Sequence, residues 1–447
     1  MRKQKWMAVL LVAAFVLLLT GCGQSGVPTA GAVDTQYSGV NGQTSIRQAA
    51  TDVGVDAQSK PGGKATASAK PSVMEITPEM AKAFENGDLD VEAVPLPPAV
   101  ITISAVGDIM AHDDTFQAAK VGNTYDFTYM MAEIQSYGKG SDFLIGNLET
   151  TLAGASRGYT GYPDFNTPEQ IADALVDTLG MDLVSTANNH SLDRGFTGLC
   201  TTLDTLDEVG LYHVGTNRSE VESETPLVVT IGGVKFGFIN YTYGLNNPKG
   251  MKYKYSVNII DKEKIRAMTE KATEAGAEYV IALMHWGVEY SRTPSTAQKE
   301  LAEWIFANTD VRLIIGTHPH VVQPIDEITV ERNGETKTGV VLYSLGNFTG
   351  SQMKAYTNTG MLATITLKLS PENENTSAVE SIDCTMLYID PNAGQEKQYR
   401  VISMGKAIHD YDSGTDPLVS AKDYAKIRDY MEDYREQLEV LPFVRVQ

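Results

Sequence analysis

Seven side chains suited to metal chemistry come at the ends of short apolar runs. They are Asp108, Glu149, Asn189, His190, His285, His318 and His320. Imidazole combined with carboxylate and amide oxygen is a ligand set that suits Zn, Mn, Fe or Ni, rather than Ca or Mg alone. No cysteine joins them, so a structural zinc site is not indicated. Several histidines around a carboxylate are typical of a hydrolytic centre, and we expect one or two divalent transition metal ions as cofactors.

The elements that must position these residues form an α/β pattern. The five apolar runs read as buried strands, and amphipathic stretches between them read as helices. Because the carboxyl ends of such strands meet at one edge of a sheet, the polar residues that follow them are expected to converge there. The expected strands are 101–107, 143–147, 183–188, 279–284 and 313–317, and the expected helices are 126–138, 168–180, 194–209, 260–275 and 295–308.

The motifs at the strand ends resemble, in order, those of the bacterial capsule-synthesis protein CapA family. The motifs are Gly107-Asp108, Asn147-Leu148-Glu149, the stretch 188–195, His285-Trp286-Gly287, the stretch 316–320 and Tyr343-Ser344-Leu345-Gly346-Asn347-Phe348. That family is associated with poly-γ-glutamate capsule synthesis and export, and it is similar to the calcineurin-like metallophosphoesterases. The resemblance implies an α/β fold of the four-layer α-β-β-α sandwich type.

The resemblance also implies a role for each residue. Asp108 and His320 would bind a first metal, while Asn189, His285 and His318 would bind a second. Glu149 would bridge the two, and His190 would donate a proton to the leaving group. Two positions depart from the superfamily pattern: Met110 stands where a second histidine is usual, and Glu149 replaces the usual bridging aspartate. Both departures concern the first metal, so one ion or two remain open.

Several neighbouring residues have both a structural and a functional interpretation. Asp193 and Arg194 are either an ion pair at a helix start or part of the catalytic group, with Arg194 binding a substrate carboxylate or phosphate. His112, Ser344 and Asn347 are candidate substrate-binding residues, or parts of loops and turns. His213 and His409 are expected to have no function. Cys200 and Cys384 are either unpaired or joined by a disulfide bond.

Composition limits the classes of partner. The chain has 447 residues, of which 42% are hydrophobic, and 36 Lys and Arg stand against 56 Asp and Glu, a net charge of −20. Such a charge repels nucleic acid, which we exclude as a partner. The expected partners are an anionic polymer or a phosphoester substrate, with other capsule-synthesis membrane proteins as further candidates.

The first residues indicate the compartment. Arg2, Lys3 and Lys5 precede an uncharged run that is too short to be a permanent membrane span, which is typical of a signal peptide. The stretch Leu19-Thr20-Gly21-Cys22 resembles a bacterial lipoprotein cleavage box, which implies lipid attachment at Cys22. The protein is therefore expected outside the cytoplasm, on the outer face of the bacterial cell membrane, with the lipid anchor as its only membrane contact.

The sequence divides into four expected parts and leaves two functions open. Residues 1–21 are the lipoprotein signal peptide, 22–98 a flexible low-complexity tether, 99–350 the CapA-like metallophosphoesterase domain, and 351–447 further strands and a C-terminal helix packed on it. One function is a metal-dependent phosphoesterase-like hydrolase or transferase in poly-γ-glutamate or capsule polymer synthesis or export. The alternative is a non-catalytic scaffold or anionic-polymer binding component of a capsule assembly complex.

Overall fold

The computed structural model describes residues 98–447, apart from 371–374, 393, 395 and 417. The expected signal peptide, the expected lipidation site Cys22 and the expected tether up to residue 97 lie outside these described residues. Within them the strands form two large sheets, of nine and six strands, and a small hairpin of β2 (Lys120–Val121) and β3 (Thr124–Tyr125). The chain therefore has the expected mixed α/β class.

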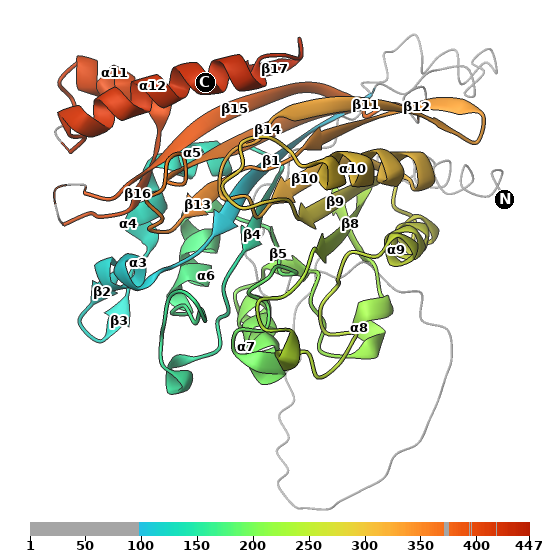
Figure 1. Cartoon of the computed structure of the whole chain (residues 1–447), viewed down its shortest axis with the longest axis horizontal. Helices are drawn as coiled ribbons and strands as arrows, with labels where there is room; N and C mark the ends of the chain where they lie inside the picture. Colours follow the sequence, from blue (N-terminus) through green and yellow to red (C-terminus); the bar gives the residue numbers. More distant parts are fainter. Residues whose placement is uncertain (1–97, 371–374, 393, 395, 417) are drawn as a thin grey trace, which may run out of the picture. The chain divides into compact units, whose positions relative to one another are not determined.

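The nine-stranded sheet combines a parallel half with an antiparallel half. Its main order is β16-β15-β14-β1-β4-β5-β6, with β13 paired to β1 and β17 paired to β15. β1 is parallel to β4 and β13 and antiparallel to β14, so it lies where the two halves meet (Figure 1). The strands are β1 (Ala99–Ile109), β4 (Phe143–Leu148), β5 (Leu183–Ser185), β6 (Tyr212–Val214), β13 (Asn347–Thr349), β14 (Thr359–Leu369), β15 (Val379–Asp390), β16 (Arg400–Ser403) and β17 (Val444–Val446).

The six-stranded sheet has a parallel centre between antiparallel edges. Its order is β11-β12-β10-β9-β8-β7, and only β11 and β7 run against their neighbours. The strands are β7 (Leu227–Ile231), β8 (Val234–Thr242), β9 (Tyr279–His285), β10 (Val311–Thr317), β11 (Ile325–Arg332) and β12 (Glu335–Leu342). The parallel centre brings the carboxyl ends of β9 and β10 to one edge.

Alternate side chains of the central strands enter different hydrophobic clusters, which explains why these strands are apolar along their whole length. On β9, Tyr279, Ile281 and Leu283 join a cluster that contains side chains of both sheets. Val280, Ala282 and Met284 point the other way, into a cluster with α9 (Lys262–Glu274) and α10 (Thr296–Asn308). Strands buried on both faces lose the polar alternation of half-exposed strands.

The remaining helices cover the nine-stranded sheet. A third cluster joins β1, β4 and β5 to the helices of residues 113–208. The C-terminal helices add Met431, Tyr434 and Leu438 to the cluster that the two sheets share. The exception is α8 (Glu220–Glu224), which buries none of its residues; the helices that cover the sheet are α3 (Asp113–Ala118), α4 (Thr128–Met131), α5 (Gln135–Gly138), α6 (Gln170–Ala174), α7 (Gly195–Glu208), α11 (Met404–Asp412) and α12 (Ala421–Leu438).

Two predicted helices are less regular than their periodicity suggested. The predicted helix 126–138 is divided into α4, a 3-10 turn at Ala132–Ile134 and α5. The predicted helix 168–180 becomes α6 followed by a π-helical turn at Leu175–Leu179, which ends at Gly180 in the left-handed conformation. The helices at 195–208, 262–274 and 296–308 match their predicted ranges within two residues. Asp261 and Ser295 cap the amino ends of α9 and α10 with side-chain hydrogen bonds.

Candidate metal centre

The carboxyl ends of β1, β4, β5, β9 and β10 bring together the six residues predicted to bind metal. Asp108 is the next-to-last residue of β1, Glu149 directly follows β4, and His285 ends β9. The turn after β5 carries Asn189, and His318 and His320 follow β10. All six are buried. Five sequence-distant segments thus meet at one place, as the sequence predicted from their strand-end positions.

Glu149 lies between two groups of ligand atoms. One group contains Glu149, His285 and His318, and the other contains Glu149, Asp108 and His320, with the ligand atoms of each group within 4.8 Å of one another. Asn189 joins the first group because its Oδ1 lies 2.7 Å from His285 Nε2. His320 Nδ1 lies 3.1 Å from Asp108 Oδ2 in the second group. One carboxylate shared by two groups is the arrangement of a bridging ligand.

Two buried atoms of this cluster have no hydrogen-bond partner among the described residues. They are Glu149 Oε1 and His318 Nδ1. Glu149 Oε1 lies 3.5 Å from His285 Nε2 and 3.9 Å from His320 Nε2. A buried polar atom without a partner loses its hydration without compensation, and native proteins seldom leave one so. Convergent nitrogen and oxygen atoms of this kind fit a divalent cation, which binds N and O ligands at ~2.0–2.2 Å.

Burial sets the protonation states of the cluster. It raises the pKa of Glu149 well above its ordinary value, and the adjacent Asp108 carboxylate raises it further. Burial and the nearby imidazoles lower the pKa of His285 well below its ordinary value and that of His318 to about 3. Neutral imidazoles have the lone pair that metal binding requires, so these two histidines are ready to bind an ion without first losing a proton.

The backbone after β10 is held in an uncommon conformation. His318 has φ 99° and His320 has φ 58°, both in the region that favours glycine. Such conformations cost on the order of 1–3 kcal/mol each and persist where the surroundings require them. The backbone N–H of His318 lies 3.3 Å from Asp108 Oδ2. The strained turn therefore places the His318 backbone N–H and the His320 imidazole beside the Asp108 carboxylate.

Two further residues belong to the cluster although the sequence did not single them out. Asn147 Nδ2 donates to Asp108 Oδ1 over 2.8 Å and lies 3.3 Å from His285 Nδ1. Asn147 belongs to the motif that ends in Glu149. Its polar amide near the end of an apolar strand is the sequence feature that could have identified it. Glu289 forms a third group of ligand atoms with His318 and His320, from a more exposed position. A carboxylate four residues beyond His285 was its only signal.

His190 lies beside the cluster rather than in it, because none of the three groups includes it. Its Nδ1 donates to Asp193 Oδ2 over 2.7 Å. Burial raises the pKa of Asp193, and the hydrogen bond to His190 partly offsets this effect. The same Asp193 oxygen accepts a 2.8 Å bond from the backbone N–H of Phe165, whose ring packs edge-on against His190 at 4.7 Å. His190 is therefore fixed in orientation, with Nε2 turned toward Asn246 Nδ2 at 3.3 Å.

Two other predicted site residues, Arg194 and His112, form hydrogen bonds with residues outside the cluster. Arg194 does not pair with Asp193; its Nη2 donates to Thr160 Oγ1 and to the Asp164 carbonyl. His112 Nδ1 accepts a bond from the Ser351 backbone N–H, and burial lowers its pKa to about 4.

Asn347 reaches the cluster, whereas Ser344 holds a turn. Asn347 Oδ1 lies 3.0 Å from His320 Nδ1, so this amide orients a candidate ligand. Ser344 Oγ accepts a bond from the Gly346 backbone N–H and is fully buried. Neither side chain has an exposed surface, because both are 0% exposed. Any contact of Ser344 or Asn347 with substrate would have to act through the residues that cover them.

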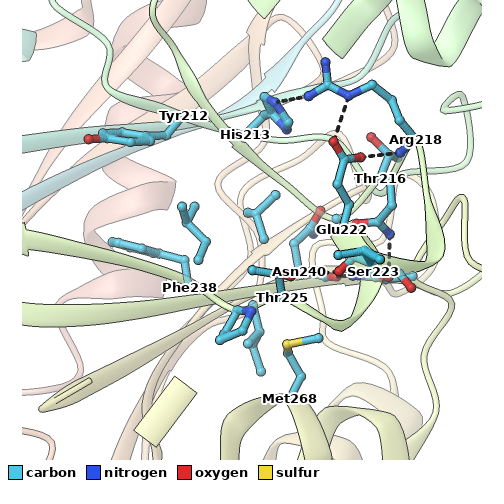
Figure 2. Close-up of a pocket in the computed structure, with 18 of the residues that line it drawn as sticks. Tyr212, His213, Thr216, Arg218, Glu222, Ser223, Thr225, Phe238, Asn240 and Met268 are labelled. Atoms are coloured by element: carbon cyan, nitrogen blue, oxygen red, sulfur yellow. Dashed lines mark hydrogen bonds and ion pairs between the residues drawn. The ribbon is translucent and has the colours of Figure 1, made fainter. Parts of the chain in front are cut away.

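A cavity among the described residues lies elsewhere. It has a volume of about 640 Å³ and lies between β6, α8 and β8, and Figure 2 shows its lining residues. His213 is one of them and bonds to Asp207 Oδ1 and, at 3.5 Å, to Arg218 Nη2. None of the candidate metal ligands lines this cavity. His409 is exposed on α11, and Cys200 and Cys384 are free, so the alternative of a disulfide bond is wrong.

The sheet-edge cluster defines a candidate two-metal centre on an α/β fold, and the comparisons place the chain in a family. Residues 102–352, more than half of the chain, match the family of the bacterial capsule synthesis protein PGA_cap, so the chain belongs to that family. It is 28% identical over 263 residues to the capsule biosynthesis protein CapA of Bacillus anthracis, covering 56% of this chain and 60% of that protein.

A second relative supports the same assignment. The PGA biosynthesis protein CapA of Bacillus subtilis (strain 168) is 27% identical over 259 residues, covering 57% of this chain and 64% of that protein. The match thus spans less than two thirds of the length of either relative. Among the described residues, no helix is both long and apolar enough to cross a membrane.

Solved structures resemble the fold only distantly. The Haemophilus influenzae NAD nucleotidase NadN has a TM-score of 0.43 at 11% identity, covering 78% of this chain and 64% of that one. The calcineurin-like phosphoesterase YfkN of Bacillus subtilis has a TM-score of 0.37 at 15% identity, covering 76% of this chain and 98% of that one. Similarity at this level gives no information about activity.

Proposed function

We propose that this CapA-family protein is a metal-dependent hydrolase or transferase of the phosphoesterase type that acts in capsule polymer synthesis or export. The observation that carries the proposal is the position of Glu149 between two groups of ligand atoms, with Oε1 accepting no hydrogen bond from any residue that the structure describes. The two sheets with helices packed on their outer faces support a four-layer sandwich of metallophosphoesterase type.

The donor set fits one or two divalent transition metal ions such as Mn, Zn, Fe or Ni. Asp108 and His320 would hold one position, Asn189, His285 and His318 the other, and Glu149 would lie between them. Bound there, the metal would polarise the phosphoryl group and lower the pKa of a coordinated water. Asn147 and Asn347 would orient the ligands through the hydrogen bonds that they already make.

His190 is the candidate proton donor to the leaving group. Its Nδ1–H is held by Asp193, which leaves Nε2 as the nitrogen that exchanges a proton with a substrate. Asp193 would stabilise the imidazolium form while it exists. Arg194 lies outside this pair, because its guanidinium is bound to Thr160 and to the Asp164 carbonyl. Its proposed contact with a substrate anion would require it to leave those partners.

The location and the polymer are part of the same proposal. The relatives are named for capsule and PGA biosynthesis, and the sequence before residue 98 predicts a lipid anchor at Cys22 on the outer face of the membrane. If so, Cys22→Ala should shift the protein from the membrane fraction to the soluble fraction or leave it unprocessed. Unchanged processing and membrane retention would contradict the anchor.

Metal content and hydrolysis measured on the same preparations test the proposal. We expect His285→Ala to lower bound Mn or Zn and to abolish hydrolysis of a generic phosphodiester, because it removes a ligand next to Glu149 and Asn189. His409→Ala, on the exposed face of α11, is the matched control and should change neither. Equal metal content in the wild type and His285→Ala would overturn the metal centre, and full metal without turnover would favour the non-catalytic alternative.

One observation favours that second candidate, an anionic-polymer binding component. The segment between β8 and α9 carries Lys249, Lys252 and Lys254, and none of the three has an ion-pair partner among the described residues. The same segment contains Asn246, which contacts His190. In a chain of net charge −20, three lysines without ion pairs on this segment would attract a polyanion, although Lys252 Nζ also lies 5.0 Å from the Tyr253 ring centroid. Other capsule-synthesis membrane proteins remain proposed partners of this function.

A further inference from the structure

Exposed apolar side chains gather on the loops around the candidate metal centre. Among the described residues, eight large hydrophobic side chains are exposed, and four of these, Tyr162, Tyr243, Val288 and Met353, lie on loops that carry or contact the centre. The others are dispersed at strand ends and helix surfaces. Single exposed apolar residues are ordinary, whereas a group around a polar centre is typical of a ligand-binding mouth.

Two of the four are tyrosines that stand beside histidines of the centre. The ring of Tyr162 lies 6.5 Å from that of His190, and the side chain is 69% exposed. The ring of Tyr243 lies 4.4 Å from that of His318 and is 45% exposed. The backbone N–H of Tyr243 donates to the His285 carbonyl over 2.9 Å, which fixes the loop to β9. Both rings are thus partly exposed next to the imidazoles proposed to donate a proton and to bind metal.

A third tyrosine, Tyr290 on the loop after β9, also lies beside a histidine of the centre. The ring of Tyr290 lies 6.0 Å from that of His320, and Lys354 Nζ rests 3.4 Å from its centroid. Tyr290 has φ 67°, and its N–H donates to the Pro319 carbonyl over 2.7 Å. An uncommon backbone conformation that a hydrogen bond maintains marks a side chain whose position matters. Tyr162, Tyr243 and Tyr290 are called the aromatic collar below.

The charges at this mouth do not suit a chain of carboxylates. Arg194 is bound to Thr160 and the Asp164 carbonyl, Lys354 covers Tyr290, and Glu289 adds an exposed negative charge. The unpaired lysines lie farther along the segment that follows Tyr243. Aromatic rings instead favour flat partners, which pack against their faces or edges. The group bound directly at the centre should therefore have a flat face as well as a negative charge.

We propose that the aromatic collar binds a flat-faced ring, a sugar or a heteroaromatic base, that is joined directly to the phosphate bound at the centre. The inference rests on the proposed function, because it assumes that the cluster of Glu149 and the histidines binds the phosphate. It assigns the ring to Tyr162 and Tyr243, which are exposed, and gives Tyr290, which Lys354 covers, the closed side of the mouth. An open-chain polyacid would not occupy this position.

Binding measurements on the full chain with added Mn²⁺ test the collar. The probes are inorganic phosphate, glucose 1-phosphate, adenosine 5′-monophosphate and a γ-linked glutamate trimer. We expect at least one ring phosphate to bind about tenfold tighter than inorganic phosphate, and Tyr162→Ala or Tyr243→Ala to remove most of that difference. Tyr243→Phe should retain it, because the ring face is kept. Tyr411→Ala on α11 is the matched control and should bind all probes like the wild type.

The outcomes separate the collar from the centre. Tighter binding of the sugar phosphate or of the nucleotide identifies which ring is recognised and supports the collar. Equal affinity for inorganic phosphate and both ring phosphates overturns the collar while the proposed metal centre stands. Preferred binding of the glutamate trimer also overturns it. If no phosphate binds, both the proposed function and the collar are wrong. Inorganic phosphate affinity that is unchanged in the tyrosine variants excludes a loss caused by misfolding.

Discussion

Asn147 links three candidate metal ligands through one amide group. Its Nδ2 lies 2.8 Å from Asp108 Oδ1, 3.5 Å from Glu149 Oε2 and 3.3 Å from His285 Nδ1. The amide is itself held, since its Oδ1 accepts a bond from Ser185 Oγ on β5. A residue that binds no metal can thus set the orientation of residues that do.

We therefore predict that Asn147→Ala weakens metal binding about 10- to 100-fold, which is the usual effect of removing a group that orients ligands. Titration of the metal-free protein with Mn²⁺ measures the change. Asn308→Ala, at the exposed end of α10, provides a control that should bind metal normally. An unchanged affinity in Asn147→Ala would show that the ligands hold their geometry without the amide.

The sequence predicted the position of a site residue only where that residue follows a recognisable strand. Asp108, Glu149, His285 and His318 follow apolar runs, so their meeting at one edge could be read from the sequence. Asn246 could not, because it lies in a segment without periodicity and reaches His190 only through the path of that loop. The tyrosines of the collar were missed for the same reason.

At the scale of elements, β1 and the chain before β13 approach so closely that only glycine fits at Gly107. A Cβ there would lie 1.9 Å from the Gly346 carbonyl oxygen, which also accepts the bond from the Asp108 backbone N–H. We predict that Gly107→Ala destabilises the protein by about 3 kcal/mol and weakens metal binding, because the strand that carries Asp108 must shift. Urea unfolding and metal titration measure both effects.

A second glycine supplies the control for this prediction. Gly244 has no atom within 4 Å of an added Cβ, so Gly244→Ala should leave stability within about 0.5 kcal/mol of the wild type. Equal stability of the two variants would mean that the β1 and β13 segments separate at little cost. The predicted destabilisation of Gly107→Ala would then be wrong.

Lys337 on β12 is the other element-scale feature, because it ends α10 from a neighbouring strand. Its Nζ donates to the carbonyls of Phe306, Thr309 and Val311, at 3.2, 2.6 and 2.7 Å. Burial lowers the pKa of this lysine from 10.5 to about 7. Two carbonyls at the end of α10 and one at the start of β10 account for a buried amino group at this position.

We predict that Lys337→Met costs about 2 kcal/mol at neutral pH, because the carbonyls lose their donor. Between about pH 7 and 10 the unfolded lysine keeps its proton while the folded one has lost it, so the wild type gains stability relative to Lys337→Met as pH rises. Urea unfolding of both proteins at about pH 7 and about pH 9 should show a widening difference. A constant difference would mean that Lys337 stays charged in the fold.

At the scale of the whole molecule, the family match and the sheet have different limits. The match ends at residue 352, and the sequence likewise suggested a domain of 99–350 with later strands packed on it. In the structure β14 pairs with β1 from Ala99–Leu369 to Ala105–Ala363, and β15 pairs with β14. Amphipathic pattern predicted that these later strands exist, but it could not say that they join the sheet beside the strand of Asp108.

The C-terminal part is therefore expected to be needed for folding of the part that carries the centre. Without residues 351–447, β1 would lose its antiparallel neighbour, and the shared cluster would lose Met361, Ile365, Met386 and Tyr434, all at 0% exposure. Removing one such side chain typically costs ~2–5 kcal/mol, so losing four together is as large as the ~5–15 kcal/mol stability of an ordinary domain. We predict that a chain ending at residue 350 has no cooperative thermal transition and binds no metal, whereas the full chain melts cooperatively and binds metal.

Circular dichroism melting and Mn²⁺ titration of the two chains make the comparison. A chain ending at residue 439, which lacks only β17 and the residues just before it, should still melt cooperatively. A sharp transition in the chain ending at 350 would show that residues 351–447 are an addition to an independent domain.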